Sequence, residues 1–453
     1  MSRWAPPYTL PTLAQERVRL LRRRGVETVI LAGADAHGIM RGKRVPIAEL
    51  DRAAEHGVAL CDVVWALPVD EHEPVEPPPQ HAGYFPRPGY PDMRAVPDLE
   101  TARIVPWHDR TALLLCDFVD HDGGAIPLAP RAVLRAVVER ARAMGVEPIA
   151  GVELEFYLLR ETPQSVLAKR PSQLEPVEAR ASAYGIVTGS RHEPFVGAVR
   201  ETLREYGLAV EACNPESGPG QFEINLRAAP ALQAADEAFL LKSAVKEIAA
   251  RQELLATFMA KPRSDWPGSS CHLHLSLRGG TSSTRRHFIG GLLAGMAELT
   301  ALLAPTPNSY RRFVPYSWAG TTATWSVDNR SAGLRVIGRG DGATRVEHRQ
   351  AGADANPYLA VSAALAAGLD GVRRGCEPPP PVDGDVYALS DDAARSLPAT
   401  LGEATDLLEH SALARDWLGD DLVEHCVAMR RAELAAQSAA VTDWETSRYL
   451  EAL

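Results

Sequence analysis

The chain has 453 residues, which is enough for two or three domains around an ample hydrophobic core. A net charge of −10 argues against a general nucleic-acid binder, and six scattered cysteines without a CxxC pair or zinc motif are typical of a cytoplasmic protein. The first ten residues lack an apolar signal core, and the longest Ala/Leu-rich stretch, Tyr358 to Leu369, is too short to cross a bilayer, so we expect no membrane contact.

The first part of the chain, residues 1–108, predicts a small α+β domain. Its helical and strand patterns mostly end at a glycine or a turn. In chain order they are a helix at Leu13 to Arg24, a strand at Glu27 to Ala32, a strand near Val45, a helix at Glu49 to His56 and a strand at Arg103 to Pro106. Eight prolines between Glu71 and Pro97 predict an extended, irregular excursion, because proline lacks the amide hydrogen that helices and sheets use.

Residues 109–453 predict a larger domain, which opens with a buried strand at Thr111 to Val119. From about residue 160 to Gly189 we expect irregular chain. The remaining patterns are helices at Pro130 to Met144, Glu193 to Tyr206, Asp236 to Gln252, Phe288 to Leu303 and Asn356 to Arg373, a strand at Ala209 to Ala212, and a helical region from Asp392 to an exposed tail.

The stretch Gly151 to Leu159 predicts a strand with two different faces. A side-chain period of two places Glu153, Glu155 and Tyr157 on one face, and only apolar residues on the other. The two carboxylates therefore point the same way, about 7 Å apart along the strand.

Three later stretches, 220–227, 270–277 and 344–350, repeat this alternation. Their polar faces carry Gln221, Glu223, Asn225 and Arg227 in the first, His272, His274 and Ser276 in the second, and Arg345, Glu347 and Arg349 in the third. Placed side by side, the four strands predict a curved sheet with helices on its apolar face and a polar, ion-filled trough on the other.

The trough predicts a divalent metal site. Four glutamates on one concave surface raise one another's pKa unless a cation neutralises them. Oxygen ligands with one or two histidines favour Mg²⁺ or Mn²⁺ over zinc. Arginines on the same faces indicate an anionic substrate beside the metal, which together suggests phosphoryl chemistry.

Six motifs in this order resemble the glutamine synthetase family over nearly the whole chain. They are GVELEF, ESGPGQFEI, GSSCHLHLSL, NSYRRFVP, DNRSAGLRV and RVEHRQAGADANPYLA. The resemblance implies an α+β fold, in which a small N-terminal β-grasp domain precedes a large catalytic domain with a curved antiparallel sheet backed by helices. It also implies a homo-oligomer, a dodecamer of two stacked hexameric rings, with active sites between the large domain of one subunit and the small domain of the next.

The resemblance further implies a role for individual residues. Two metal ions per site, Mg²⁺ or Mn²⁺, are implied, one held by Glu155, Glu216 and Glu223 and the other by Glu153, His272 and Glu347. Gly268, Arg312 and Arg349 resemble the glutamate-binding set, and Arg330 resembles the arginine that stabilises the transferring phosphoryl group. The positions that match the ATP side are Glu211, His274, Ser276, Arg335 and Arg345.

The implied reaction has two steps, in which ATP phosphorylates the glutamate side chain and a nitrogen nucleophile then displaces phosphate. Family members that use ammonia carry a flap glutamate where this chain has Trp318, and an ammonium-binding Asp-Gly-Ser-Ser loop where it has Leu60 to Trp65. An indole cannot accept a proton, but it packs on hydrocarbon and attracts alkylammonium by a cation–π contact of about 0.5–2 kcal/mol. We therefore expect a primary amine, such as a polyamine, ethanolamine or another alkyl or aryl amine, beside Trp318 and Tyr184. This resembles the γ-glutamyl amine synthetases of the family.

Several alternatives stay open on the sequence. The base that deprotonates the amine is Glu216 or Asp62 of an adjoining subunit, unless the amine is weakly basic and needs no base. Ordinary glutamine synthetase activity with ammonia is the second hypothesis, and a non-catalytic ring-forming pseudoenzyme is the third. Pro267 replaces an asparagine that contacts glutamate in the family, which leaves room for a different acid substrate.

Overall fold

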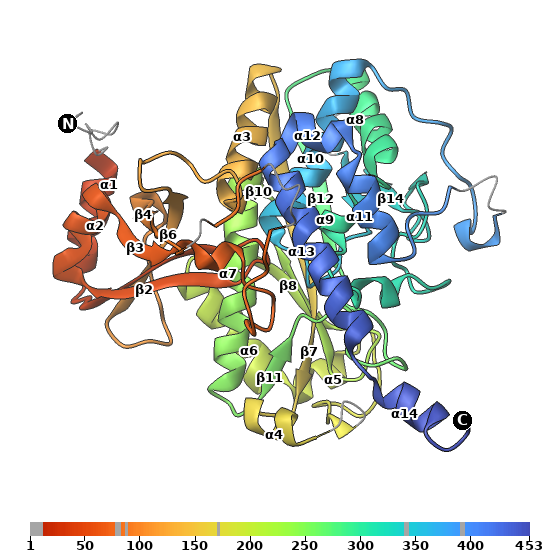
Figure 1. Cartoon of the computed structure of the whole chain (residues 1–453), viewed down its shortest axis with the longest axis horizontal. Helices are drawn as coiled ribbons and strands as arrows, with labels where there is room; N and C mark the ends of the chain where they lie inside the picture. Colours follow the sequence, from red (N-terminus) through yellow and green to blue (C-terminus); the bar gives the residue numbers. More distant parts are fainter. Residues whose placement is uncertain (1–11, 78–82, 87–88, 170–172, 339–343, 390–394) are drawn as a thin grey trace.

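Two β-sheets organise the part of the chain that the computed structural model describes, residues 12–77, 83–86, 89–169, 173–338, 344–389 and 395–453. The smaller sheet lies at one end of the molecule, and the larger sheet with most of the helices forms the body (Figure 1). Residues 1–10, where we expected no signal core, lie outside the described residues. Among the described helices, none is long and apolar enough to cross a membrane.

The smaller sheet has the strand order β2-β1-β6-β4-β3, with β5 paired to β6. β1 runs parallel to β6 and the other pairs are antiparallel. The strands and helices of this part are α1 (Thr12–Arg23), β1 (Thr28–Ala34), β2 (Met40–Pro46), α2 (Leu50–His56), β3 (Val58–Cys61), β4 (Asp92–Pro97), β5 (Arg103–Ile104) and β6 (Thr111–Val119). Aliphatic residues of β1 and β6 pack with those of α1 and α2 in one buried cluster.

Two predictions for this part of the chain are wrong. The strand expected to open the larger domain, β6, lies at the centre of the smaller sheet, so the change from one sheet to the other falls after Val119 and not at residue 108. The proline-rich excursion also ends in a regular strand, β4, because the residues between Pro91 and Pro97 are free of proline and pair with β3 and β6. Residues 78–82 and 87–88 of that excursion lie outside the described residues.

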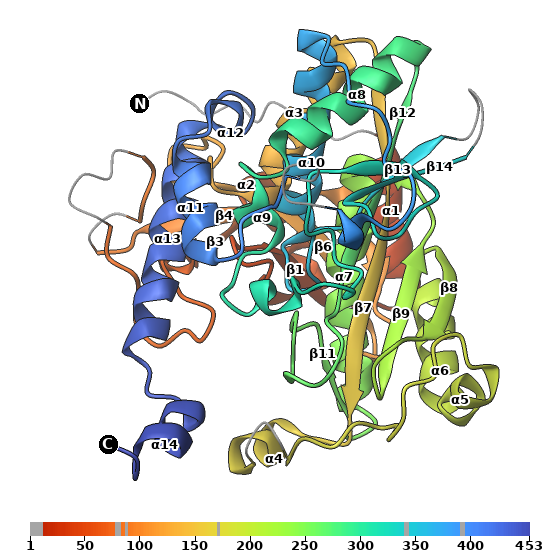
Figure 2. The ribbon, with the colours of Figure 1, turned by 90° about the vertical axis from the view of Figure 1, so that its right-hand side faces the viewer.

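The larger sheet has nine strands in the described chain, in the order β13-β14-β15-β12-β7-β9-β8, with β10 and β11 paired to β7. Its pairs are antiparallel except β13 with β14, at one edge. The strands are β7 (Glu147–Leu159), β8 (Val210–Pro215), β9 (Gln221–Leu226), β10 (Ala229–Pro230), β11 (Leu255–Thr257), β12 (Cys271–Arg278), β13 (Trp325–Val327), β14 (Leu334–Ile337) and β15 (Arg345–His348). Figure 2 shows the long strand β7 beside β9 and β8.

The four strands with predicted polar faces are direct neighbours, in the order β15-β12-β7-β9. Their register sets carboxylates and imidazoles opposite one another across the strands. The facing pairs are Glu153 with His272, Glu153 with Asn225, Glu155 with Glu223, and His274 with Glu347. Residues directly opposite on one face lie about 4.5–5.5 Å apart at Cβ, so this register gathers the polar side chains.

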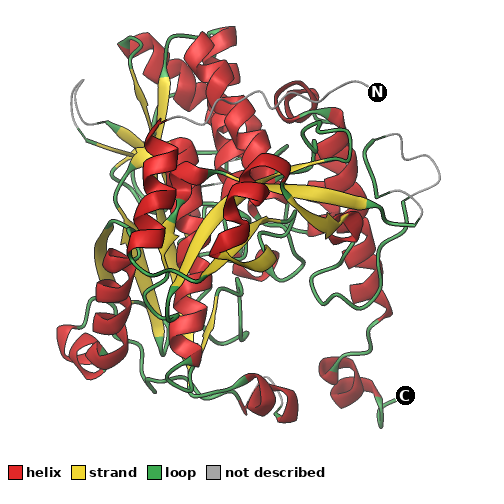
Figure 3. Ribbon diagram, turned by 90° about the vertical axis from the view of Figure 1, so that its left-hand side faces the viewer, coloured by secondary structure: helices red, strands yellow, loops and turns green. Residues whose placement is uncertain are grey.

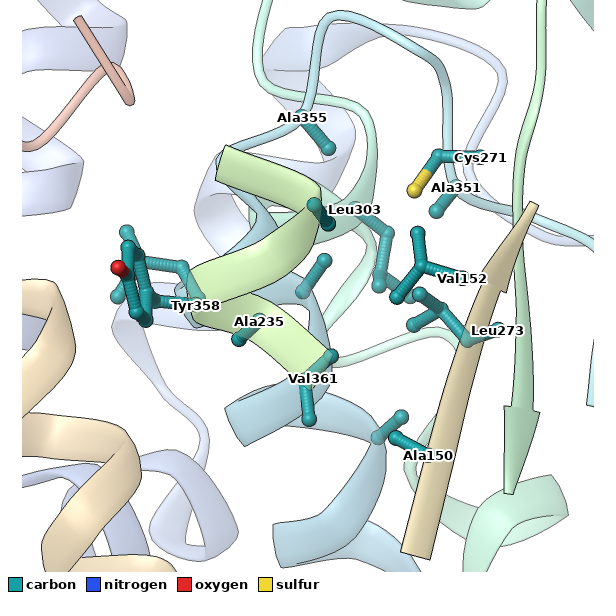
Figure 4. Packing of buried hydrophobic residues seen from close by; sticks show 14 of the residues in the cluster. Ala150, Val152, Ala235, Cys271, Leu273, Leu303, Ala351, Ala355, Tyr358 and Val361 are labelled. Carbon is teal, nitrogen blue, oxygen red and sulfur yellow. The ribbon is translucent and has the colours of Figure 1, made fainter. Parts of the chain in front are cut away.

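Helices α7 (Ala231–Ala250) and α10 (Pro357–Arg374) cover the apolar face of this sheet. Figure 4 shows Val152 and Leu273 of the sheet facing Ala235 of α7 and Val361 of α10. The predicted arrangement, with a helix-covered face and a free polar face, is confirmed. Burying the apolar face stabilises the sheet by roughly 25 cal/mol per Å² removed from water.

The other helices of the larger part are α3 (Pro130–Ala143), α4 (Pro163–Ala168), α5 (Ile186–Arg191), α6 (Glu193–Glu205), α8 (Ser282–Gly295), α9 (Thr300–Leu303), α11 (Leu401–Glu409), α12 (Ala412–Leu418), α13 (Asp420–Ala439) and α14 (Asp443–Tyr449). The single helix predicted over Phe288 to Leu303 is wrong, because a turn at 296–299 separates α8 from α9. The irregular segment also contains α4 and α5. The tail helix α14 projects away from the body, as predicted (Figure 3).

Candidate active site

A cavity of about 820 Å³ lies on the polar face of the larger sheet. Strands β7, β9, β12 and β15 supply its floor, and the loops 183–184, 264–268 and 314–318 supply its rim. Twelve of the residues predicted from the sequence line it. They are Glu153, Glu155, Glu216, Glu223, His272, Glu347, Gly268, Arg349, Arg330, Arg335, Trp318 and Tyr184.

The floor of the cavity brings carboxylates and an imidazole within ligand distance of one another. Ligand atoms of Glu153, Glu223 and His272 all lie within 4.8 Å of each other, and a second such group joins Glu153 to His274 and Glu347. His272 Nδ1 lies 2.7 Å from Glu153 Oε1. Neither group coincides with a predicted metal set. The first combines Glu223 of one predicted set with Glu153 and His272 of the other, and the second contains His274, which we expected on the ATP side.

Without a cation, two of these carboxyl groups have strongly raised pKa values. Burial raises the pKa of Glu155 to about 8, and the charge of Glu216 adds to the rise. Burial raises the pKa of Glu223 to about 10, with a further rise from the charges of Glu153 and Glu155. Burial is the largest influence on Glu153 and opposes its ionisation, but the hydrogen bonds and charges of His272 and His274 together outweigh it and hold that pKa below its usual range. Full ionisation of the floor would therefore place more negative charge there than its surroundings neutralise.

The residues present fit a divalent metal of the Mg²⁺ or Mn²⁺ type. His272 is fully buried, and its Nε2 atom has no hydrogen-bond partner among the described residues. With Nδ1–H directed at Glu153, the Nε2 lone pair is free to bind a metal. Carboxylate oxygens make up the rest of the donor set, and these are the ligands that Mg²⁺ and Mn²⁺ prefer.

Three arginines face the same cavity. Arg335 Nη1 donates to Glu347 Oε2 at 3.0 Å, and Arg349 forms an ion pair with the other oxygen of Glu347. Arg349 Nη2 also donates to the backbone carbonyl of Trp318 at 3.1 Å, which ties the floor to the rim. Arg330 is exposed on the cavity wall. Guanidinium groups beside a metal site suit an anionic substrate that carries carboxylate or phosphate.

Aromatic side chains gather at the rim. Trp318, Tyr316 and Tyr184 line the cavity with 52%, 62% and 65% of their surface exposed, and all three have left-handed backbone conformations with φ between 56° and 61°. Bulky residues rarely adopt this conformation, which clusters at ligand-binding segments. The Trp318 amide donates to the Tyr387 hydroxyl at 3.0 Å, which fixes this part of the rim.

Some predicted residues do not reach the cavity. Arg312 is fully buried behind it, where it donates to the Gln350 carbonyl at 3.0 Å and to Ser270 Oγ at 2.8 Å. Asp62 is buried in the part of the molecule that contains the smaller sheet, residues 12–119, which we call the small lobe. The other four are ATP-side predictions that lie outside the cavity lining, namely Glu211, His274, Ser276 and Arg345. Arg345 Nε lies 3.3 Å from His274 Nδ1, so these two residues remain near the metal-binding group.

Sequence reasoning missed part of the wall. Lys261, Asp265 and Tyr316 line the cavity from loops that carry no periodic pattern. The signal that could have found Tyr316 is its place in the motif around Trp318, two residues away. Ser270 was assigned no role, although its amide donates to Glu155 Oε2 at 2.8 Å.

Comparisons with known proteins agree with this geometry. Residues 127–449 match the family model for the glutamine synthetase catalytic domain. The chain is 36% identical to glutamate–isopropylamine ligase of Pseudomonas sp, covering 95% of this chain and 96% of the relative. It is 38% identical to γ-glutamylethanolamide synthetase of Streptomyces coelicolor, covering 97% and 96%. The fold matches a solved GmaS/ADP complex with a TM-score of 0.82 and 29% identity, over 96% of this chain and 99% of that one.

Proposed function

Because the chain belongs to the glutamine synthetase family, we propose that it is an ATP-dependent ligase that joins glutamate to a primary amine. The products are a γ-glutamylamide, ADP and phosphate. The names of two similar proteins, one an isopropylamine ligase and the other an ethanolamide synthetase, support an amine in place of ammonia.

The observation that carries the proposal is the chemical division of one cavity. Its floor has acidic and imidazole groups together with arginines, whereas its rim is aromatic at Trp318, Tyr316 and Tyr184. The floor suits a nucleotide phosphate and an amino acid, and the rim suits the carbon substituent of an amine.

The family to which the chain belongs implies a reaction in two steps. The glutamate γ-carboxylate attacks the terminal phosphorus of ATP, which forms γ-glutamyl phosphate and releases ADP. The amine nitrogen then attacks the activated carbonyl carbon, phosphate leaves, and the amine loses a proton. We propose that Arg330 stabilises the transferring phosphoryl charge and that Arg349 orients glutamate, because both line the cavity and a guanidinium offers a forked set of donors to phosphate or carboxylate.

Divalent metal belongs to the proposal as well. Glu153, Glu155, Glu216, Glu223, His272 and Glu347 would hold it. When bound, such an ion neutralises phosphate charge and acts as a Lewis acid. The residues themselves provide the preformed pocket, and Asn225 helps by donating to Glu153 Oε2 at 2.6 Å.

Removal of the amine proton needs a base near neutral pH. Neutralising an alkylammonium at pH 7 costs roughly 4–5 kcal/mol, because its pKa lies near 10.4. Glu216 lines the cavity, and burial raises its pKa, which makes it a better proton acceptor than an exposed carboxylate. Asp62 would act only on the site of a neighbouring subunit, within the proposed ring assembly of stacked hexamers.

A mass-spectrometric screen of primary amines with ATP, Mg²⁺ and glutamate tests the function. We expect a γ-glutamylamide whose formation has a higher kcat/KM than glutamine formation from ammonium. Faster reaction with ammonium would instead support glutamine synthetase activity. Absence of any glutamate-dependent ATP hydrolysis would support a non-catalytic role, and product formed from another acid would correct the choice of glutamate.

A further inference from the structure

A second cavity, of about 840 Å³, separates the small lobe from the body of the molecule. It shares no lining residue with the candidate active site. Strands β1 and β2 line one side, and helices α7 and α13 with the loop at 305–308 line the other. Figure 1 shows β2 extending from the small lobe toward α7.

Five cationic side chains line this second cavity. Lys242 and Lys246 lie one turn apart on α7, Arg430 lies on α13, and Lys43 and Arg44 lie on β2. Among the residues that the structure describes, none forms an ion pair with any of these five. Unpaired cations in a concave, partly buried site create a positive potential that attracts anions.

Three acidic residues, Glu247, Asp354 and Glu433, also line the cavity, and they offset only part of the charge of the five cations. Glu247 Oε2 accepts hydrogen bonds from Trp107 and His108, both at 2.7 Å. Asp354 Oδ2 accepts from two hydroxyl groups, those of Thr306 and Ser309. Burial raises the pKa of Glu433, which disfavours its charged form.

Two of the buried cations keep N–H donors that can bind a ligand. Arg430 is 97% buried, and its one hydrogen bond within the described chain is a long one, 3.5 Å from Nε to the Ala301 carbonyl. Lys242 Nζ donates to the carbonyls of Ala353 and Ala355, which leaves one of its three N–H groups for a ligand. Burial lowers the pKa of Lys242 and of Lys246, and each pKa rises again when an anion binds nearby.

We propose that this second cavity binds a small organic polyanion, one with two or more carboxylate or phosphate charges on a carbon body. The lysines and Arg430 recognise the charges. An apolar wall of Met40, Phe258 and Leu302 receives the carbon body. The ligand would bridge the two lobes, because its contacts come from both.

Two hydrogen-bonded links lead from this cavity to the candidate active site. Asn308 lines the second cavity, and it exchanges hydrogen bonds of 2.8 and 2.9 Å with the backbone of Lys261, which lines the first. Asp354 holds Ser309, the first residue of the turn that carries Arg312. Arg312 in turn donates to Ser270 Oγ on the wall of the first cavity. Bound anion therefore changes the glutamate affinity of the active site, an effect that rests on the proposed function.

Titration calorimetry with citrate, succinate and pyrophosphate, in buffer without divalent metal, tests the binding. We expect saturable binding of at least one probe, and the strongest probe distinguishes a carboxylate from a phosphate ligand. Lys246→Gln should weaken binding about tenfold, because one charge contact contributes about 1.4 kcal/mol. Lys246→Arg should retain binding. Arg251→Gln, at the end of the same helix and outside the cavity, is the matched control and should bind like the parent.

The Arg330→Gln variant distinguishes probe binding in the second cavity from binding in the candidate active site. It should bind the probe unchanged, whereas a loss equal to that of Lys246→Gln would assign the anion to the active site and overturn the proposal. Failure of all three probes to bind would overturn it as well. A saturating probe should also change the KM for glutamate by about fivefold in the parent and less in Lys246→Gln. An unchanged KM with intact binding would refute the link between the cavities and leave the proposed function unaffected.

Discussion

At Gly268, on the wall of the candidate active site, a missing side chain leaves room for Arg312. A Cβ atom at this position would lie 2.5 Å from Arg312 Cγ and 3.2 Å from the Ala260 carbonyl. We predict that Gly268→Ala displaces the buried arginine and raises the KM for glutamate about tenfold, at a stability cost of about 1–3 kcal/mol. Steady-state kinetics with varied glutamate measure the effect.

Gly151→Ala is the matched control for this change. Its Cβ would meet its nearest neighbours at 3.6 Å, which is ordinary contact, although Gly151 lies on the strand that carries Glu153. We expect a KM near that of the parent. An equal KM in Gly268→Ala would show that Arg312 does not position glutamate.

Trp318 on the cavity rim decides between an amine and ammonia. Replacing the indole by a carboxylate, in Trp318→Glu, restores a group that pairs with ammonium and accepts its proton. We predict that kcat/KM for ammonium rises by about tenfold or more, and that kcat/KM for the preferred amine falls through loss of a contact of about 0.5–2 kcal/mol. Phosphate release with ammonium and with amines measures both.

Trp318→Phe is the control, because it keeps an aromatic face without a carboxylate. Amine use should persist in this variant, and ammonium use should stay low. If Trp318→Glu leaves ammonium use unchanged, the rim does not select the nucleophile.

The two faces of strand β15 carry different chemistry. Glu347 faces the active site, while the neighbouring His348 is buried on the opposite side, and burial alone lowers the pKa of His348 to about 4. The unfolded chain binds a proton at this residue near pH 6.5, so protonation favours unfolding. The stability that neutral His348 contributes is present above pH 6.5 and is lost as the pH falls toward 4.

We predict that His348→Met reduces this acid sensitivity. Between pH 7.5 and 4, the parent should lose about 3 kcal/mol more unfolding free energy than the variant does. Urea unfolding at several pH values measures the difference, with exposed His56→Gln as the control. A constant difference between variant and parent across this range would contradict the prediction.

The elements of the site were predictable where side chains alternate with a period of two. β7, β9, β12 and β15 have acidic or imidazole residues on one face, and this pattern alone indicated that they share a sheet. It could not give Tyr316 or Lys261, because both lie on loops whose positions depend on contacts far apart in sequence. Nor could it show the break between α8 and α9, since the chain from Phe288 to Leu303 is mostly apolar and has no proline at the turn.

At the scale of the whole molecule, Arg131 ties the two sheets together. Its guanidinium forms ion pairs with Asp98 and Asp117 beside the smaller sheet, at 2.8 and 3.1 Å, and with Asp236 of α7 at 2.9 Å. Removal of the cation leaves Asp236 buried without its charge partner. We predict that Arg131→Met lowers the unfolding free energy by about 3–5 kcal/mol, as calorimetry would measure.

Arg135→Met is the corresponding control. Arg135 also pairs with Asp117, but its side chain is 34% exposed, so water screens the pair and we expect a loss of about 0–1 kcal/mol. Equal effects of the two substitutions would show that the lobes do not depend on Arg131.

The division of the chain was the least predictable feature at this scale. The composition of Thr111 to Val119 is that of any buried strand, and local sequence cannot tell which sheet it joins. It pairs with β1, some 80 positions earlier in the chain, and with β4, the strand that follows the proline-rich segment. The boundary therefore emerged only from the pairing.

The separation of floor and rim has a consequence for how such ligases diversify. The acidic groups of strands β7, β9 and β15 lie on strands that are paired on both sides. A one-residue insertion in such a strand would turn its carboxylates to the helix-covered face. Tyr184, Tyr316 and Trp318 sit on connecting segments that tolerate changes in length and composition. Exchanging these segments between related ligases can thus change the preferred amine. The floor residues that serve phosphoryl transfer stay unchanged.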